Sequence, residues 1–317
     1  MRFVDAATTA RHLPFVPLIA ALRQAFTAGG EVPLRHTHSI AHANDPGHAA
    51  GTVLLMPAWR AGGRLGLKTV TIFPANRALG RPALHSVYTL FDAVTGAPLA
   101  QLDGNEITSR RTAAASALAA SFLARDDATR LLVVGAGRVA ALLAPALRSV
   151  RPITQVEVWN RTAASARSLA AQLCEQGFEA SATEDLPGAV ARAHVVSCAT
   201  SANAALIQGA CLQPGTHLDL IGSFKPDMRE TDAECFARCR VYCDTTEALS
   251  KSGDVLNAIA AGAFAAGALQ ATLADLCRGE RGRRDTQERT LFKSVGSALE
   301  DLAAAELVFD TLPPGEA

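Results

Sequence analysis

Hydrophobic and polar positions along the chain follow two different patterns, and the change falls near residue 105. Before that point, a helix expected over 14–28 precedes five segments with the composition of strands, separated by Gly, Pro and Asn residues. These segments cover residues 35–40, 52–57, 64–73, 84–91 and 98–103. Beyond residue 105, short apolar segments alternate with helical sequence, which is typical of an α/β protein.

The second pattern starts with a long Ala-rich helix, expected over 111–124. Strands are then predicted at 130–134, 155–159, 194–198, 217–221 and 240–243, and a last helix at 294–309. We therefore predict an α/β fold in which a Rossmann domain, a doubly wound parallel sheet, accompanies a strand-rich α+β domain. The expected domains are 1–112, with 294–317 packing back on it, and 113–293, with a cleft between them.

Composition narrows the class of protein. With 317 residues the chain exceeds the size of about 250–300 residues at which one core stops growing, so two domains are expected. Thirty Lys and Arg residues balance 30 Asp and Glu residues, which argues against nucleic-acid or anionic-membrane binding. The uncharged segment 255–274 is rich in Ala and Gly and contains polar residues, so we interpret it as a buried or half-buried helix. Small-molecule chemistry is therefore the leading class.

Cysteines and histidines give no pattern typical of a metal site. Seven cysteines, an odd number, and the lack of a signal-peptide pattern favour reduced thiols in a cytoplasmic protein. The spacing of Cys235, Cys239 and Cys243 matches neither zinc nor iron–sulfur sites, and we interpret this cluster as structural. His36 and His38 share one face of a predicted strand without an acidic or thiolate ligand nearby, so we predict no metal.

A nucleotide-binding fingerprint follows the first strand of the α/β part. Residues 131–140 read as a buried strand that runs into G-x-G-x-x-A, with Gly135 and Gly137 at the glycine positions, and a helix follows over 140–150. Glycines there permit a tight turn and let the backbone approach a pyrophosphate, which then lies at the helix N-terminus. Because strand, helix and next strand are all in place, the motif predicts a dinucleotide site.

The end of the second strand bears on which dinucleotide is bound. Enzymes that use NAD usually carry Asp or Glu there, whereas this chain has Asn160, Arg161 and Thr162. Asn160 does not repel a 2′-phosphate and Arg161 can pair with one, so NADP(H) is favoured and NAD(H) remains possible. The alternative is that Arg161 is only a solvated residue at a strand end.

Lysine is rare in this arginine-rich chain, with four residues at positions 68, 225, 251 and 293. Lys68 lies in the middle of an apolar strand, where an ammonium without a function is costly. A buried lysine beside other cations can lose its proton, which an arginine cannot do. We therefore predict a functional Lys68, with a lysine that extends from an exposed strand face as the alternative.

A pair of arginines, Arg110 and Arg111, is expected to open the Ala-rich helix at the domain junction. Positive charge at a helix N-terminus is mildly unfavourable, so the pair implies an anionic partner. Because adjacent helix residues diverge, only one of the two can point inward.

Taken in order along the chain, several motifs resemble the ornithine cyclodeaminase/mu-crystallin family over nearly the whole length. They are Lys68, 111–118 (RTAAASAL), Gly135-x-Gly137, 222–230 (GSFKPDMRE), 252–254 (SGD) and 292–301 (FKSVGSALED). The resemblance implies a homodimer whose first domain binds substrate and forms the dimer, and whose second domain is a Rossmann domain. It also implies chemistry at a carbon that bears an amino or imino group next to a carboxylate.

The resemblance also assigns roles to single residues. Arg35, Lys68 and Arg111 resemble the family's clamp on the substrate carboxylate, with Lys68 also the proton donor or acceptor. The field of two arginines is expected to lower the pKa of that lysine. Further positions resemble those that line the cofactor: Thr112, Arg138, Val139, Thr200, Gly222 and Ser294.

Two departures from ornithine cyclodeaminases concern the handling of a diamine. Phe224 stands where those enzymes carry an Asp, and the segment 52–56 is apolar where they carry an acidic residue. The two acidic residues that bind the amino groups of a diamine in those enzymes are therefore absent at these positions. Asp227 is open to two readings, a catalytic proton relay or a cap of the following turn.

The first hypothesis is an NAD(P)H-dependent reductase of a cyclic ketimine such as pyrroline-2-carboxylate or piperideine-2-carboxylate. Protonation of the imine, through Lys68 or a bound water, makes it a better hydride acceptor. The alternatives are an ornithine cyclodeaminase that uses NAD⁺ catalytically and releases ammonia, an alanine dehydrogenase-type oxidoreductase, and a protein that only binds NADPH. The expected partners are a small imino or amino acid and a second copy of the chain, not nucleic acid or membrane.

Overall fold

The computed structural model describes residues 1–43 and 45–313, and the chain forms two compact units. The first comprises Met1–Arg111 together with the C-terminal segment that starts at Ser297. The second comprises Thr112–Gly296. Each unit is built around its own sheet.

The sheet of the first unit has six strands in the order β1-β6-β5-β4-β3-β2. Neighbouring strands are antiparallel except for the parallel pair β1 and β6. The strands are β1 (Arg2–Val4), β2 (His36–His42), β3 (Asp45–Trp59), β4 (Arg64–Ile72), β5 (Leu84–Asp92) and β6 (Pro98–Asp103). The helices are α1 (Ala6–Arg11), α2 (Phe15–Ala28) and α11 (Ala298–Thr311), with a 3₁₀ turn, η1, at Pro74–Leu79.

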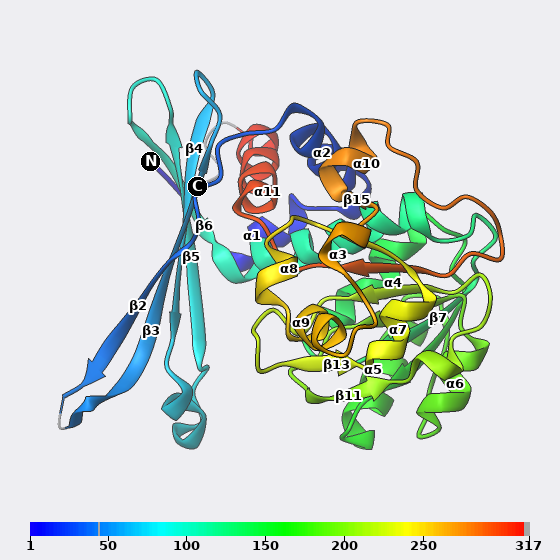
Figure 1. The fold of residues 1–317 in the computed structure, drawn as a ribbon. Helices are drawn as coiled ribbons and strands as arrows, with labels where there is room; N and C mark the ends of the chain where they lie inside the picture. Colours follow the sequence, from blue (N-terminus) through cyan, green and yellow to red (C-terminus); the bar gives the residue numbers. More distant parts are fainter. Residues whose placement is uncertain (44, 314–317) are drawn as a thin grey trace. The chain divides into compact units, whose positions relative to one another are not determined.

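One face of this sheet forms the core of the first unit. Helix α11 packs against β3, β4 and β5, and α2 packs against α11 (Figure 1). Strand side chains alternate between the two faces, and in β4 the buried positions are Gly66, Lys68 and Val70. Lys68 therefore points toward the helix-covered face, and the other two buried residues of β4 are small or apolar.

The second unit contains an eight-stranded parallel sheet in the order β15-β14-β16-β12-β10-β7-β8-β9. The chain order reverses on either side of β7, which is the position where α/β sheets bind ligands at the carboxyl ends of their strands. Its strands are β7 (Arg130–Val134), β8 (Gln155–Trp159), β9 (Glu179–Ala182), β10 (Val195–Cys198), β12 (His217–Leu220), β14 (Arg240–Cys243), β15 (Ala271–Thr272) and β16 (Thr290–Lys293). A separate two-stranded sheet pairs β11 (Asn203–Ile207) with β13 (Arg229–Thr231).

Helices connect these strands, as the alternating pattern predicts. They are α4 (Ala140–Arg148), α5 (Ala163–Glu175), α6 (Leu186–Arg192), α7 (Ala233–Arg238), α8 (Ala248–Lys251), α9 (Gly253–Ala260) and α10 (Leu273–Cys277), with 3₁₀ turns η2 (Gly209–Cys211) and η3 (Ala266–Ala268). Helix α3 (Gly104–Leu123) begins in the first unit and continues into the second. The predicted α/β fold class, a Rossmann sheet with a strand-rich companion, is confirmed.

Several sequence-based boundaries are wrong, among them the start of β3 at Asp45 and not at residue 52, and three of them have a local reason. Helix α3 starts seven residues earlier than expected, because the Asp103 carboxylate accepts the Glu106 backbone N–H and caps a polar first turn. The predicted helix from 294 begins only at Ala298, after the Ser297 cap, since Thr290–Lys293 is a buried strand inside the sheet. The segment 255–274 is not one helix, because α9 ends before Gly262, which has a φ of 69°.

None of the helices in the part of the chain that the structure describes is long and apolar enough to span a membrane.

Candidate active site

Lys68 lies in the core of the first unit, with only 2% of its surface exposed. The sheet register places it between Met56 on β3 and Tyr88 on β5. Its Nζ lies 2.6 Å from Asp301 Oδ2 and 3.4 Å from Thr108 Oγ1. Burial lowers the pKa of Lys68 to about 8, while Asp301 opposes that shift and Arg111 adds to it. Lys68 can therefore exchange a proton near neutral pH.

Arg111 is buried on α3 and completes the same cluster. Its Nε donates to Asp301 Oδ1 at 2.8 Å and its Nη1 donates to Glu300 Oε2 at 2.6 Å. Burial by itself disfavours the charged guanidinium, but the two carboxylates outweigh it and raise the pKa of Arg111. Nε and Nη1 are therefore both engaged by carboxylates of α11.

The sequence suggested that Arg110 and Arg111 open the Ala-rich helix, and the structure shows that they do not. Helix α3 begins at Gly104, so both residues lie in its interior. The expected divergence is confirmed: Arg111 points into the core, whereas Arg110 is half-buried and pairs with Glu106 one turn earlier, at 3.2 Å. The anionic partner that the pair implied is present within the protein, as the carboxylates of Glu300 and Asp301.

Glu300 and Asp301 are the residues that sequence reasoning missed at this site. Both are fully buried in the first turn of α11, which the Ser297 side chain caps by accepting the Leu299 N–H at 3.2 Å. Burial raises the pKa of Asp301, but Arg111 and Lys68 reverse that effect and hold it below the usual value. Two adjacent acidic residues between a cap and the apolar segment 302–305 were the available signal.

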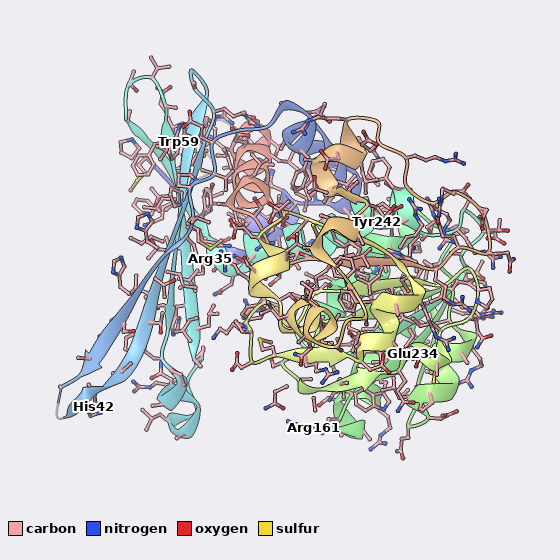
Figure 2. The ribbon with its side chains drawn as sticks, in the orientation of Figure 1. Arg35, His42, Trp59, Arg161, Glu234 and Tyr242 are labelled. Atoms are coloured by element: carbon pink, nitrogen blue, oxygen red, sulfur yellow. The ribbon has the colours of Figure 1, made fainter. Side chains whose placement is uncertain are left out.

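Arg35 directly precedes β2 and is half-buried (Figure 2). His36 pairs with Leu55, and Met56 pairs with Lys68. Continuing that register by one residue brings Arg35 level with Lys68 on the same face, two strands or about 10 Å away. Asp227 instead lies in an exposed turn before β13 in the second unit, and its proposed role stays a prediction.

In the second unit, the turn after β7 fits the pyrophosphate of a dinucleotide. Gly135 has a φ of 116°, and a Cβ there would lie 2.6 Å from the Ala199 carbonyl oxygen, so only glycine is tolerated. Gly137 is exposed, with no heavy atom within 4 Å of the place its Cβ would take. Arg138 is exposed beside it, and Val139 is half-buried directly before α4.

The turn after β8 is open to solvent. Asn160 donates from Nδ2 to the Thr162 carbonyl oxygen at 3.1 Å, and Thr162 precedes α5. Arg161 is exposed between them (Figure 2). The turn thus presents a guanidinium and, within residues 160–162, no carboxylate.

Three other predicted cofactor positions, Thr200, Gly222 and Ser294, follow the adjacent strands β10, β12 and β16. Buried ionisable side chains that sequence reasoning missed hold all three. Glu230 Oε1 accepts both the backbone N–H and the hydroxyl of Thr200 at 2.8 Å, and Lys293 Nζ donates to the Gly222 carbonyl oxygen. The Thr112 side chain, at the start of the second unit, is buried on α3.

Two further carboxylates complete this network. Asp254 Oδ2 lies 3.7 Å from Lys293 Nζ. Asp244 Oδ2 accepts the Ser294 hydroxyl at 3.2 Å and the N–H groups of Val295 and Gly296 at 2.7 and 2.6 Å. Hydrogen bonds with these buried side chains therefore hold the loops at the carboxyl ends of the strands in place.

Within residues 1–43 and 45–313, no group of three or more His, Cys, Asp and Glu side chains could hold a metal ion. The His36 and His38 rings stack on exposed β2 with centroids 6.5 Å apart. All seven cysteines are free, and Cys235, Cys239 and Cys243 are buried or half-buried around α7 and β14.

A doubly wound sheet with a glycine-rich turn, accompanied by a unit that buries a lysine among carboxylates and arginine, defines a dinucleotide-binding protein of the Rossmann class. Within that class, a model of the ornithine cyclodeaminase/mu-crystallin family matches residues 12–316, and the chain belongs to this family. The predicted family is confirmed.

Several proteins with a known name or a solved structure are similar to this chain over most of its length. The chain is 42% identical to Delta(1)-pyrroline-2-carboxylate reductase of Paracoccus denitrificans, over 83% of this chain and 84% of that protein. It is 30% identical to the solved Thermococcus litoralis Delta(1)-pyrroline-2-carboxylate reductase with NADH and L-proline, with a TM-score of 0.89 over 98% and 97% of the two chains. An archaeal alanine dehydrogenase dimer with bound NAD is 26% identical, with a TM-score of 0.89 over 98% and 95%.

Proposed function

We propose that this protein is an NAD(P)H-dependent reductase of a cyclic ketimine carboxylate, such as pyrroline-2-carboxylate or piperideine-2-carboxylate. The observation that carries the proposal is the buried Lys68, with a pKa of about 8, held between Asp301 and Arg111. The names and bound molecules of the similar reductases support the substrate class.

In the proposed reaction, Arg111 and Arg35 bind the substrate carboxylate and Lys68 acts on the imine nitrogen. When bound, the reduced nicotinamide supplies the hydride for the imine carbon. Lys68 Nζ gives a proton to the nitrogen, directly or through a water, and later regains one from solvent, so the C=N bond gains one hydride and one proton. With its pKa near 8, Lys68 is mostly protonated at neutral pH and can serve as this acid.

The surroundings of Lys68 favour a ring over a diamine. On β3 the residue beside Lys68 is Met56, which is buried, and Leu54 lies on the same face. An ammonium at the far end of a substrate would find no carboxylate in the segment 52–56 of this strand, and Phe224 occupies the position where cyclodeaminases carry an Asp. This composition supports reduction over ammonia release.

NADP(H) is the proposed cofactor over NAD(H). The support is the exposed Arg161, beside an Asn160 whose amide is bound to the turn itself. Without a carboxylate in the turn, the ribose 2′-phosphate meets a cation and no repulsion. The two solved neighbours described above contain NADH and NAD, so the preference rests on this turn alone.

A homodimer that forms through the first unit is also proposed. The sheet face opposite α11 carries mainly apolar side chains, which are half-buried or exposed: Phe3, Leu55, Trp59, Leu65, Leu67, Val87 and Phe91. Such a broad apolar face is typical of a surface that another protein covers. A second copy of the chain offers a matching face by two-fold symmetry, and the archaeal neighbour is described as a dimer.

The state of the thiols bears on the location of the protein in the cell. Seven free cysteines support a cytoplasmic location.

The direct test is nicotinamide oxidation with pyrroline-2-carboxylate, run in parallel with NADPH and NADH, beside an assay of ammonia release from ornithine. Consumption of the reduced cofactor without ammonia release is the expected result. Ammonia release without net cofactor change would contradict it and indicate a cyclodeaminase. Cofactor binding with no turnover of either substrate would indicate a binding protein.

A further inference from the structure

We infer that Asp301 is a positioning residue, whose one buried carboxylate holds Lys68 and Arg111 together and controls when Lys68 releases its proton. The inference deepens the proposed reductase function and rests on it for the kinetic consequences. Asp301 itself does not touch the substrate, and it acts through the two cations.

The geometry makes Asp301 the bridge between three separate elements. Its Oδ2 lies 2.6 Å from Lys68 Nζ on β4, and its Oδ1 accepts from Arg111 Nε on α3 at 2.8 Å. The side chain is fully buried on α11, so water does not compete for either contact. One carboxylate therefore contacts both cations and sets their separation.

The charges of the cluster balance when Lys68 is protonated. Two cations, Lys68 and Arg111, then face two anions, Glu300 and Asp301. Loss of the Lys68 proton leaves a net negative charge in a buried site, which is unfavourable. Burial of the ammonium favours proton loss and Asp301 opposes it, so this carboxylate is the main group that keeps Lys68 charged until the imine accepts the proton.

Glu300 provides a matched comparison on the neighbouring position. It is equally buried and carries the same charge, but it pairs with Arg111 Nη1 at 2.6 Å. Its effect on the Lys68 proton is weaker than that of Asp301, which is second only to burial. The two carboxylates are thus expected to differ in function: Asp301 acts on the proton of Lys68 and Glu300 acts on the orientation of Arg111.

The low number of lysines makes the inference testable without any assay of activity. With ¹³C-labelled lysine, the chain gives four side-chain signals, from positions 68, 225, 251 and 293, and a Lys68→Met variant assigns the first. In the wild type we expect the Lys68 signal to titrate near pH 8. Asp301→Asn should reduce the affinity of Lys68 for its proton by about tenfold or more, and Glu300→Gln should change it by less than about threefold.

The pH dependence of kcat/KM gives the second readout. The loss of activity at alkaline pH, where Lys68 loses its proton, should move to lower pH in Asp301→Asn and stay in place in Glu300→Gln. Glu300→Gln should instead raise KM for the imino acid more than it lowers kcat. Asp301→Glu keeps the charge but moves it, so it should lower kcat while the alkaline limb stays at the wild-type pH.

An unchanged Lys68 titration in Asp301→Asn would overturn the inference. If that variant does not fold, Asp301→Glu decides instead, and an alkaline limb that moves with it would contradict the assigned role. If the wild type reduces no imino acid, the proposed function fails, whereas the Lys68 titration still tests the role of Asp301.

Discussion

At the scale of single residues, the chain buries the ammonium of Lys68 in a place where a charge is costly. Lys68 is buried in a sheet core, and the shared carboxylate of Asp301 offsets part of the cost. The compromise leaves the proton of Lys68 less tightly held than that of a solvated lysine. A residue poised in this way is suited to exchange protons at neutral pH.

Removal of the Lys68 ammonium should therefore stop the chemistry and spare the cofactor. We expect Lys68→Met to lower kcat by about 10²–10⁴-fold, the usual contribution of a positioned acid, with a nearly unchanged Kd for NADPH. Steady-state kinetics and fluorescence titration with NADPH measure the two quantities. Lys251→Met, which removes a half-buried lysine paired with Glu247, is the control. Comparable turnover in Lys68→Met would remove this lysine from the mechanism.

The cofactor preference also belongs to a single side chain. Arg161→Asp replaces the cation beside the expected 2′-phosphate with an anion, so we expect the ratio of kcat/KM for NADPH to that for NADH to fall by about 10–100-fold. Arg167→Asp, at an exposed position on α5, should leave the ratio within about twofold. A ratio that does not move in Arg161→Asp would mean that the turn after β8 does not read the phosphate.

At the scale of secondary-structure elements, the strand ends of the Rossmann sheet depend on buried charges. Burial raises the pKa of Glu230 to about 8, an effect that Asp254 strengthens and that Lys293 and the Thr200 donors oppose. Because the folded state then binds its proton more tightly than the unfolded chain, this group costs stability as pH rises from about 4.5 toward 8.

Glu230→Gln removes that titration and keeps an oxygen to accept from Thr200. Its free energy of unfolding relative to the wild type should rise with pH between 5 and 8, by at most about 1.4 kcal/mol per pH unit. Urea unfolding of both proteins at pH 5, 6.5 and 8 measures the difference. A gap that is independent of pH would show that Glu230 is ionised throughout, with Lys293 as its effective counter-ion.

At the scale of the whole molecule, the first unit covers one face of its sheet with α11 and presents an apolar second face. Strands β3, β4 and β5 each place large apolar side chains there, including Leu55, Leu67 and Val87. A protein that exposes such a face alone in solution is prone to associate. The proposed homodimer buries it.

A charge on this face should disrupt the dimer without unfolding the chain. Val87 is 42% exposed on β5, and Val87→Glu is expected to shift the light-scattering mass from about twice the chain mass of 33.0 kDa toward the monomer. Val94→Glu, at a position 73% exposed in the turn after β5, is the matched control and should stay dimeric. A Val87→Glu protein that remains a dimer would place the interface elsewhere.

Local pattern predicted those elements whose neighbours in the sequence determine them. Strands β7, β8 and β14 and helix α2 lie within one residue of their predicted bounds, because each is a short apolar or amphipathic segment between strong turn signals. The strand β16 was not recognised, since a segment of four residues is too short to show a periodicity of its own. A central parallel strand is recognised by the strands beside it, which local sequence does not contain.

The sequence by itself determined the fold class, the glycine-rich turn at Gly135 and Gly137, and the unusual place of Lys68 in an apolar strand, because each depends on a local requirement of backbone conformation or burial. Only the tertiary structure decided which charges meet. Asp301 is 233 positions from Lys68 in the sequence, and Glu300 is 189 positions from Arg111. Pairing at such separations follows from how α3 and α11 pack beside β4, and the energy of a buried charge depends on that packing and not on its sequence neighbours.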